Sequence, residues 1–184
     1  MANTITLTNG NDSETGTDLD DIIWSLDGDD TVFGGIGSDT IHGGNGSDEL
    51  WGGADNDTIY GDNDNDKIDG GDGNDSLNAG KGDDTVDGGA GDDYIEGGSQ
   101  LDHLYGDAGN DTLMGGRASD RLWGGDDNDL LDGGEGLDQL YGEAGDDTLI
   151  GGDDQDVLDG GTGANSLLGG NQNDISKVVL VVMF

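Results

Sequence analysis

A nine-residue periodicity runs through almost the whole chain and constrains its fold more than any other feature. When the sequence is cut every nine residues from Leu7 to Lys177, nineteen nonapeptides fit without an insertion or a deletion. The sixth place is aspartate in eighteen of the nineteen, and Asn165 is the exception. The eighth place is aliphatic in seventeen, the exceptions being Glu14 and Ser176 in the two end repeats. Such regularity predicts a repeat architecture in which each nonapeptide is one structural unit.

The repeat has the consensus Gly-Gly-x-Gly-x-Asp-x-aliphatic-x, and its two halves make different demands on the backbone. Glycine at places one, two and four permits positive φ angles and close backbone approach, which predicts a tight turn. The last three places predict a very short strand with place eight facing inward and places seven and nine facing outward. Gln100 and Ala118 replace the fourth-place glycine, so we expect the turn to be least favourable there. Two nonapeptides should make one 18-residue coil.

This consensus resembles the repeats-in-toxin (RTX) calcium-binding nonapeptide, also called the hemolysin-type repeat. The resemblance covers residues 7–177, and five repeats match at every defined place: 34–42, 43–51, 70–78, 88–96 and 133–141. It implies an all-β fold, a parallel β-roll or right-handed β-solenoid of about nineteen nonapeptides with two per coil, and Ca²⁺ held between neighbouring turns. We therefore expect an N-terminal edge strand at 1–6, the roll at 7–177, and an apolar C-terminal strand at 178–184 that serves as a cap, an assembly element or a secretion element.

The charge of the chain indicates that its partners are cations. The net charge is -38, from 43 acidic and 5 basic side chains among 184 residues, with 40 glycines and neither proline nor cysteine. Such a chain repels phosphate, so we expect no nucleic-acid binding. The one continuous apolar run, Val178 to Phe184, is too short to span a bilayer, so we expect no membrane insertion. This composition alone is typical of a disordered acidic tail, but a tail has no reason to keep an aliphatic residue two places after each aspartate. We expect disorder without cations and folding coupled to ion binding.

The spacing of the aspartates predicts calcium sites between coils. Coils stack about 4.8 Å apart, so Asp39 should face Asp57, and carboxylates at that distance repel unless a hard divalent ion lies between them. Nineteen repeats give seventeen such pairs, which allows up to about 17 Ca²⁺ ions. The predicted ligands are Asp21, Asp30, Asp39, Asp48, Asp57, Asp66, Asp75, Asp84, Asp93, Asp102, Asp111, Asp120, Asp129, Asp138, Asp147, Asp156 and Asp174, with backbone carbonyls of turn residues such as Gly35, Gly37, Gly44, Gly46, Gly71, Gly73, Gly89, Gly91, Gly134 and Gly136.

Seven of the nine aromatic residues fall at the ninth place, which faces outward. We expect Trp24, His42 and Tyr60 to stack on one face of the roll, and two further stacks on the other. One explanation is that ladders of like residues stabilise neighbouring strands. The other is a contact surface for a glycan, a second roll or a host domain. The candidate surface residues are Trp24, Trp51, Tyr60, Tyr105, Trp123 and Tyr141.

The sequence favours a structural or binding role over catalysis. His42 and His103 both lie at outward places, and neither belongs to a recognisable catalytic motif, so we do not expect an enzyme. Our first hypothesis is a secreted, calcium-binding structural roll that self-associates through its terminal strands. The alternatives are a glycan-binding or adhesion module that recognises surface polysaccharide through the exposed aromatic ladders, and a detached secretion module of a larger enzyme. The N-terminus lacks the pattern of a cleaved signal, so the RTX resemblance implies type I secretion from a Gram-negative bacterium and an extracellular location.

Overall fold

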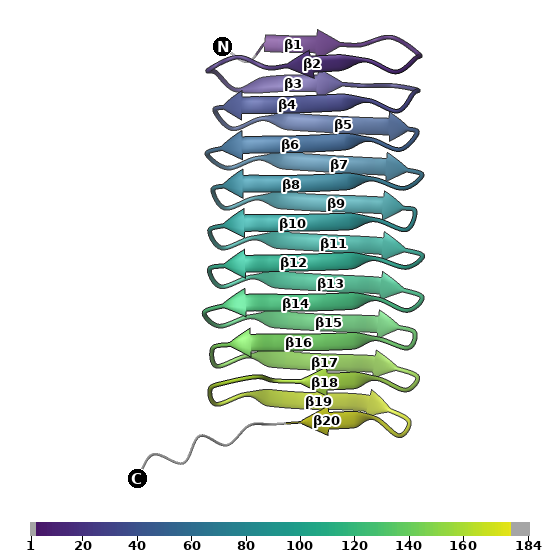
Figure 1. The fold of residues 1–184 in the computed structure, drawn as a ribbon, viewed down its shortest axis with the longest axis vertical. Helices are drawn as coiled ribbons and strands as arrows, with labels where there is room; N and C mark the ends of the chain where they lie inside the picture. Colours follow the sequence, from purple (N-terminus) through teal and green to yellow (C-terminus); the bar gives the residue numbers. More distant parts are fainter. Residues whose placement is uncertain (1–2, 178–184) are drawn as a thin grey trace.

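The computed structural model describes residues 3–177 and shows a solenoid of two parallel sheets with ten strands each (Figure 1). The first sheet contains, in spatial order, β1 (Asn3–Thr6), β3 (Asp21–Trp24), β5 (Thr40–Asn45), β7 (Thr58–Asn63), β9 (Ser76–Lys81), β11 (Tyr94–Ser99), β13 (Thr112–Arg117), β15 (Leu130–Glu135), β17 (Thr148–Asp153) and β19 (Ser166–Asn171). The second contains β2 (Ser13–Thr15), β4 (Thr31–Ile36), β6 (Glu49–Ala54), β8 (Lys67–Asp72), β10 (Thr85–Ala90), β12 (His103–Ala108), β14 (Arg121–Asp126), β16 (Gln139–Ala144), β18 (Val157–Asp159) and β20 (Ile175–Lys177). The predicted parallel β-roll is confirmed.

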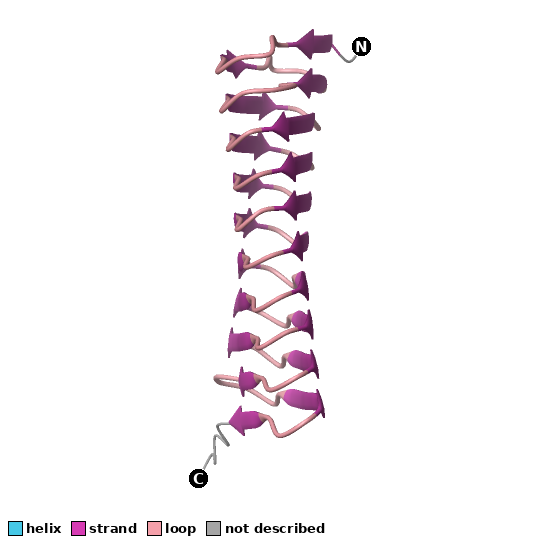
Figure 2. Ribbon diagram, turned by 90° about the vertical axis from the view of Figure 1, so that its right-hand side faces the viewer, coloured by secondary structure: helices cyan, strands magenta, loops and turns pink. Residues whose placement is uncertain are grey.

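The register of the sheets repeats every eighteen residues. Successive strands alternate between the two sheets, and each strand pairs in parallel with the strand two positions along the chain, as in Ile41↔Ile59 and Leu104↔Leu122. Viewed from the side, the roll is a narrow stack of two strand layers joined by short turns (Figure 2). Two nonapeptides therefore make one coil, as predicted. The predicted C-terminal strand at 178–184 lies outside the described residues.

The strands are longer than the sequence pattern predicts. Most have six residues, and β5, for example, runs through the last three places of one repeat and the first three of the next. The turn is thereby confined to places four to six. Positive φ angles occur at places two and four, and Gln100 and Ala118 adopt them too, at 84° and 80°. The turns that seemed least favourable from sequence are therefore formed like the others.

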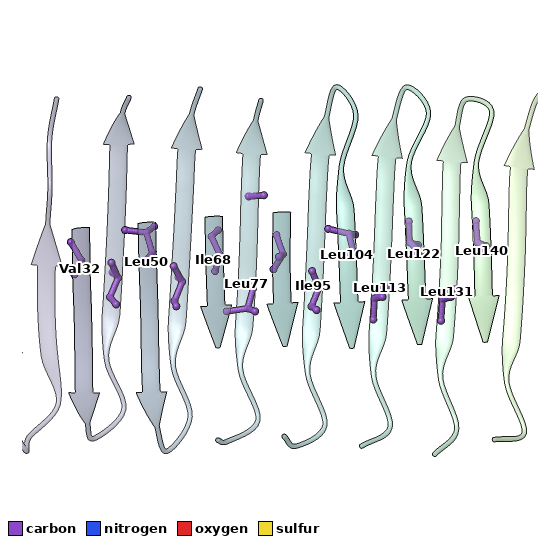
Figure 3. Close-up of a cluster of buried hydrophobic side chains, with 14 of the residues drawn as sticks. Val32, Leu50, Ile68, Leu77, Ile95, Leu104, Leu113, Leu122, Leu131 and Leu140 are labelled. Atoms are coloured by element: carbon purple, nitrogen blue, oxygen red, sulfur yellow. The ribbon is translucent and has the colours of Figure 1, made fainter. Parts of the chain in front are cut away.

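A single column of aliphatic side chains fills the space between the two sheets (Figure 3). The sixteen eighth-place residues from Ile23 to Leu158 are all fully buried, and Ala79 joins them. Ile5, Leu7 and Leu167 are partly buried against the two ends of this column. Each coil thus contributes two apolar side chains, and burial of each stabilises the fold by about 1.5–3 kcal/mol.

Candidate calcium sites

The sixth-place aspartates lie beside the apolar core, at the turns that join the two sheets. The sixteen from Asp21 to Asp156 are at most 4 % exposed, although each carries a carboxylate. Asp174, in the last repeat, is half-buried. Burial of an ionised carboxylate is costly unless it is hydrogen-bonded and its charge is matched. The two oxygens of these carboxylates must therefore be considered separately.

One oxygen of each interior carboxylate is bonded to the coil before it. The backbone N–H of Asp39 donates to Oδ1 of Asp57 at 2.7 Å, and that of Asp48 donates to Oδ1 of Asp66 at 2.9 Å. The same contact recurs at eighteen-residue spacing from Asp12 to Asp156. Aspartates that the sequence predicts to face each other are therefore neighbours in adjacent coils, joined by a backbone-to-carboxylate hydrogen bond.

The other oxygen is buried without a partner. In all fifteen sixth-place aspartates from Asp30 to Asp156, Oδ2 is buried and makes no hydrogen bond. A Cβ added at Gly115, the first place of its repeat, would lie 2.7 Å from Oδ2 of Asp120 and 2.7 Å from the carbonyl oxygen of Gly133. The place-one glycine therefore leaves a hollow on which a carboxylate oxygen and a carbonyl oxygen converge. Two acceptors with no donor between them repel, so this arrangement requires a cation or a proton.

Burial raises the pKa of the fifteen sixth-place carboxyl groups from Asp30 to Asp156 above the ordinary value for aspartate. The pKa is raised to about 8 in Asp66 and Asp102, and to about 7 in Asp57 and Asp93. Loss of hydration on burial is the main cause, and the charges of aspartates in adjacent coils add to it, while the backbone hydrogen bond opposes it. The ionised form, which a cation needs, is thus disfavoured unless the cation is bound.

The donor set suits calcium. The sites offer carboxylate and carbonyl oxygens, which are the ligands of hard cations that take six to eight oxygens. Within residues 3–177, no three His, Cys, Asp or Glu side chains come together to hold a metal, so backbone carbonyls would have to complete each shell. Of the predicted carbonyl donors, Gly46 and the other place-four glycines lie in the turns, whereas Gly44 and the other place-two glycines lie within strands; both sets have positive φ angles. When bound, Ca²⁺ would supply the positive charge that the buried carboxylates lack.

A second ladder, formed by the fifth-place side chains, lies along the outside of the turns. The consensus, which leaves place five undefined, did not predict it. The fifth place is Asn, Asp or Ser in fifteen of nineteen repeats. The backbone N–H of Asn110 donates to Oδ1 of Asp92 at 2.8 Å, and that of Asn128 donates to Oδ1 of Asn110 at 3.3 Å. These bonds point in the opposite sense to those of the sixth place, so each turn is tied to both of its neighbours. The repeated small polar residue at place five was the available signal.

The aromatic residues form the three predicted ladders. The ring of His42 stacks on Trp24 at 3.8 Å and on Tyr60 at 4.7 Å. On the second sheet, Phe33 stacks on Trp51 at 4.5 Å, and Tyr105, Trp123 and Tyr141 form a continuous stack. Within each ladder the rings lie within 14° of parallel, so they cover one another's faces and leave their edges exposed.

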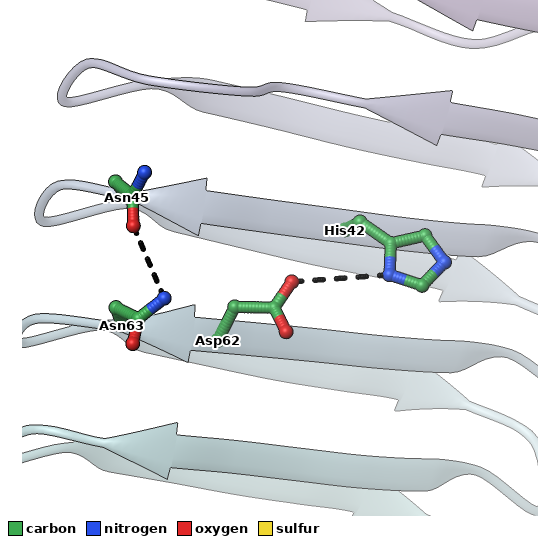
Figure 4. Close-up of polar contacts among 4 residues, drawn as sticks. All are labelled: His42, Asn45, Asp62 and Asn63. Atoms are coloured by element: carbon green, nitrogen blue, oxygen red, sulfur yellow. Dashed lines mark hydrogen bonds and ion pairs between the residues drawn. The ribbon is translucent and has the colours of Figure 1, made fainter.

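A pocket of about 400 Å³ lies beside the first aromatic ladder. Its third-place side chains are linked by hydrogen bonds, including one from Asn63 to Asn45 at 3.1 Å (Figure 4). Asp62, in the adjacent strand β7, lies 3.9 Å from Nδ1 of His42 in β5. His103 lies on the opposite sheet, 3.4 Å from Arg121. Both histidines therefore lie on the outer faces of the sheets, whereas the sixth-place carboxylates are buried inside the roll.

Sequence comparisons agree with this geometry. A periodic stack of glycine turns that bury unpartnered carboxylates defines a β-roll of the cation-binding class. The family model of the RTX calcium-binding nonapeptide repeat matches residues 6–41, 15–50, 33–68, 42–77, 69–104, 105–140 and 141–175. The chain belongs to this family, whose repeats bind Ca²⁺ and are typical of secreted proteins of Gram-negative bacteria. A search of curated proteins gave no match.

Proposed function

We propose that this protein is a structural β-roll whose folding is coupled to calcium binding. The observation that carries the proposal is the unbroken series of fifteen buried Oδ2 atoms without a hydrogen-bond partner, from Asp30 to Asp156. Each unpaired acceptor costs about 1–3 kcal/mol, and more when it is charged. Summed along the roll, this cost exceeds the net stability of an ordinary domain, about 5–15 kcal/mol. Ions that neutralise the column would convert the same carboxylates into ligands.

A calcium titration followed by far-UV circular dichroism and by hydrodynamic radius tests this proposal. The expected result is an expanded, largely unstructured chain at neutral pH in EDTA, which becomes compact and β-structured as Ca²⁺ is added. Mg²⁺ is the matched control, since its smaller and more strictly octahedral shell should fit these turns poorly. A chain that is equally β-structured in EDTA would exclude the coupling.

Coupled folding would also suit secretion. A chain that stays unfolded where calcium is scarce could leave the cell in an extended form and fold outside, where calcium is abundant. This supports the extracellular location and the type I route that the RTX resemblance implies. Residues 3–177 contain no helix long and apolar enough to cross a membrane. Fusion of a reporter to the chain, expressed with and without a type I exporter, would test the route.

Self-association through the ends is a second role that the architecture supports. Within residues 3–177, the outermost strands, β1 and β2 at one end and β19 and β20 at the other, each pair with one neighbouring strand. Such edges present unpaired backbone groups that can pair with another chain. Polar residues at place eight of the end repeats, Glu14 and Ser176, limit the apolar contact that a second roll could add. Light scattering in calcium at increasing protein concentration would measure this association.

The aromatic ladders favour strand stabilisation over glycan binding. The C–H groups of a sugar pack on the electron-rich face of an aromatic ring. Neighbouring rings cover both faces of His42 and of Trp123, and one face of every other ring in the ladders. Glycan or polysaccharide binding would therefore have to use the remaining faces, the ring edges and the polar third-place ladder. Tryptophan fluorescence during titration with neutral and acidic oligosaccharides would detect it, with Trp123→Ala as the control.

A further inference from the structure

The two ends of the roll differ from its interior in how they satisfy the sixth-place side chain. In the interior, Oδ2 of the aspartate has no partner from Asp30 to Asp156. In the first coil, Oδ2 of each sixth-place aspartate accepts two hydrogen bonds. Thr8 donates to Oδ2 of Asp12 from its backbone N–H at 2.8 Å and from its hydroxyl at 2.7 Å. Thr17 donates to Oδ2 of Asp21 in the same way, at 2.6 Å and 3.0 Å.

The sequence restricts this contact to the N-terminal end. Thr8 and Thr17 stand at the second place of their repeats, and no other repeat has threonine there. The hydroxyl supplies a donor that glycine, the usual residue at this place, cannot supply. These hydrogen bonds lower the pKa of Asp12, whereas burial raises the pKa of the interior aspartates. Oδ2 of both first-coil aspartates therefore has donors within the coil, although Oδ1 of Asp21 is buried without a partner.

In the last coil, near the C-terminal end of the roll, the sixth-place side chain is the amide of Asn165 instead of a carboxylate. Asn165 is the only sixth-place residue that is not aspartate. Its Oδ1 still accepts from the backbone N–H of Asp147 at 2.8 Å, so the ladder between coils continues. Its Nδ2 donates to the carbonyl oxygen of Gly160. That carbonyl would lie 3.0 Å from a Cβ added at Gly142, in the hollow that Oδ2 of Asp147 also faces. Nδ2 of Asn165 is thus a donor at the position where an interior aspartate has Oδ2, whereas Oδ2 of Asp147 still has no partner.

A physical reason for this difference follows from the geometry of a solenoid. Within residues 3–177, an interior coil has a neighbour on both sides, whereas the first and last coils have one, so an ion there would have fewer ligands and would bind more weakly than an interior ion. A hydrogen bond within the coil needs no second neighbour. Asp174, at the remaining end position, is only half-buried.

We propose that hydrogen bonds from Thr8, Thr17 and Asn165 replace calcium at the ends of the roll, so that these three positions are caps and only interior turns hold ions. The proposal rests on the calcium-binding function proposed above. It predicts that the number of bound ions is smaller than the number of aspartate pairs. It also predicts that each cap can be converted into an ion site by restoring the interior residue.

The number of ions bound at saturating calcium tests the proposal. It can be measured by native mass spectrometry and by elemental analysis after dialysis. Thr17→Gly and Asn165→Asp restore the interior residue types, and each should bind one more Ca²⁺ ion than the unmodified chain. Thr17→Ser keeps the hydroxyl donor and should leave the number unchanged. Asp129→Asn, which copies the Asn165 arrangement into the interior, should bind one ion fewer.

The outcomes separate this inference from the function on which it rests. A chain that binds no calcium contradicts the proposed function. If Asp129→Asn loses an ion while Thr17→Gly and Asn165→Asp match the unmodified chain, calcium binding stands and the capping proposal is overturned. An Asn165→Asp chain that loses β structure in saturating calcium also contradicts it, since a new ion would hold the added carboxylate.

Discussion

Two columns of side chains run through this roll two residues apart in the sequence, and both are buried. The eighth-place column is aliphatic, and every member from Ile23 to Leu158 is inaccessible to solvent. The sixth-place column is aspartate, and it is nearly as inaccessible. Burial of the first stabilises the fold unaided, whereas burial of the second opposes it until its charge is matched. Burial to the same extent therefore affects stability in opposite directions in the two columns. Because the carboxylates need a matching charge, the fold depends on a bound cation.

The largest expected effect comes from removing a core side chain, and it should leave calcium binding intact. Leu104→Ala, in the middle of the aliphatic column, should lower the free energy of unfolding in calcium by about 2–5 kcal/mol, because it leaves a cavity in a fully buried site. The number of ions at saturation should not change. Chemical denaturation and native mass spectrometry measure the two quantities. Leu168→Ala, on an exposed outer face, is the control and should change stability by less than about 0.5 kcal/mol.

A substitution in the carboxylate column should have the opposite effects to Leu104→Ala: it should stabilise the ion-free chain and reduce the number of bound ions. Asp102→Asn removes a charge that loses its hydration on burial and offers an N–H donor, as Asn165 does. We expect it to stabilise the ion-free chain by about 1–3 kcal/mol, since a buried acceptor gains a partner, and to abolish one ion site. The calcium concentration at the folding midpoint, followed by circular dichroism, measures both. Equal effects of Asp102→Asn with and without calcium would show that the column does not bind ions.

Acid should partly replace calcium. The folded-state pKa of the interior aspartates is raised, to about 8 in Asp66 and about 7 in Asp138, from an ordinary value of 3.8. Protons therefore bind the folded form more tightly, so the stability of the ion-free roll is greatest below the ordinary pKa and is lost as pH rises through about 6–8. Circular dichroism in EDTA should show β structure increasing on acidification through this window. Calcium affinity should change in the other direction and increase with pH, since protons and ions compete for the same oxygens.

The outward aromatic column should give the smallest effect. Trp123 stacks between Tyr105 and Tyr141, at ring distances of 4.6 Å and 5.7 Å. Trp123→Ala should lower stability by about 1–2 kcal/mol, because stacked pairs contribute about 0.5–1.5 kcal/mol each beyond their buried area. The ion count should stay the same. Thermal unfolding in calcium measures the change, and a loss of less than about 0.3 kcal/mol would show that the ladder serves something other than strand stability.

The periodicity predicts the positions of the columns because each place recurs in a fixed environment. The nine-residue register is sufficient to infer an 18-residue coil, an inward column at place eight and a turn column at place six. The same reasoning places Trp24, His42 and Tyr60 in one stack. These inferences need only the rule that residues eighteen apart lie in neighbouring coils.

The other features depend on geometry that a consensus does not contain. The strands extend through places one to three because the place-one glycine packs inward beside a carboxylate. From glycine content alone, these three places are predicted to belong to the turn. The separate partners of Oδ1 and Oδ2 follow from the exact path of the backbone at each turn. Thr17 and Asn165 depart from the consensus residues at their places. Their role as caps follows from their hydrogen-bond partners, which the sequence alone does not identify.

Hydrogen–deuterium exchange at neutral pH, compared in EDTA and in saturating calcium, tests the central claim most directly. It reports whether the backbone of each coil is hydrogen-bonded, one segment at a time. Amides from Asp21 to Leu158 should exchange rapidly in EDTA and become strongly protected in calcium, with the change spread over the whole interior. Protection of these amides in EDTA equal to that in calcium would contradict it, because the roll would then tolerate its buried carboxylates without any ion.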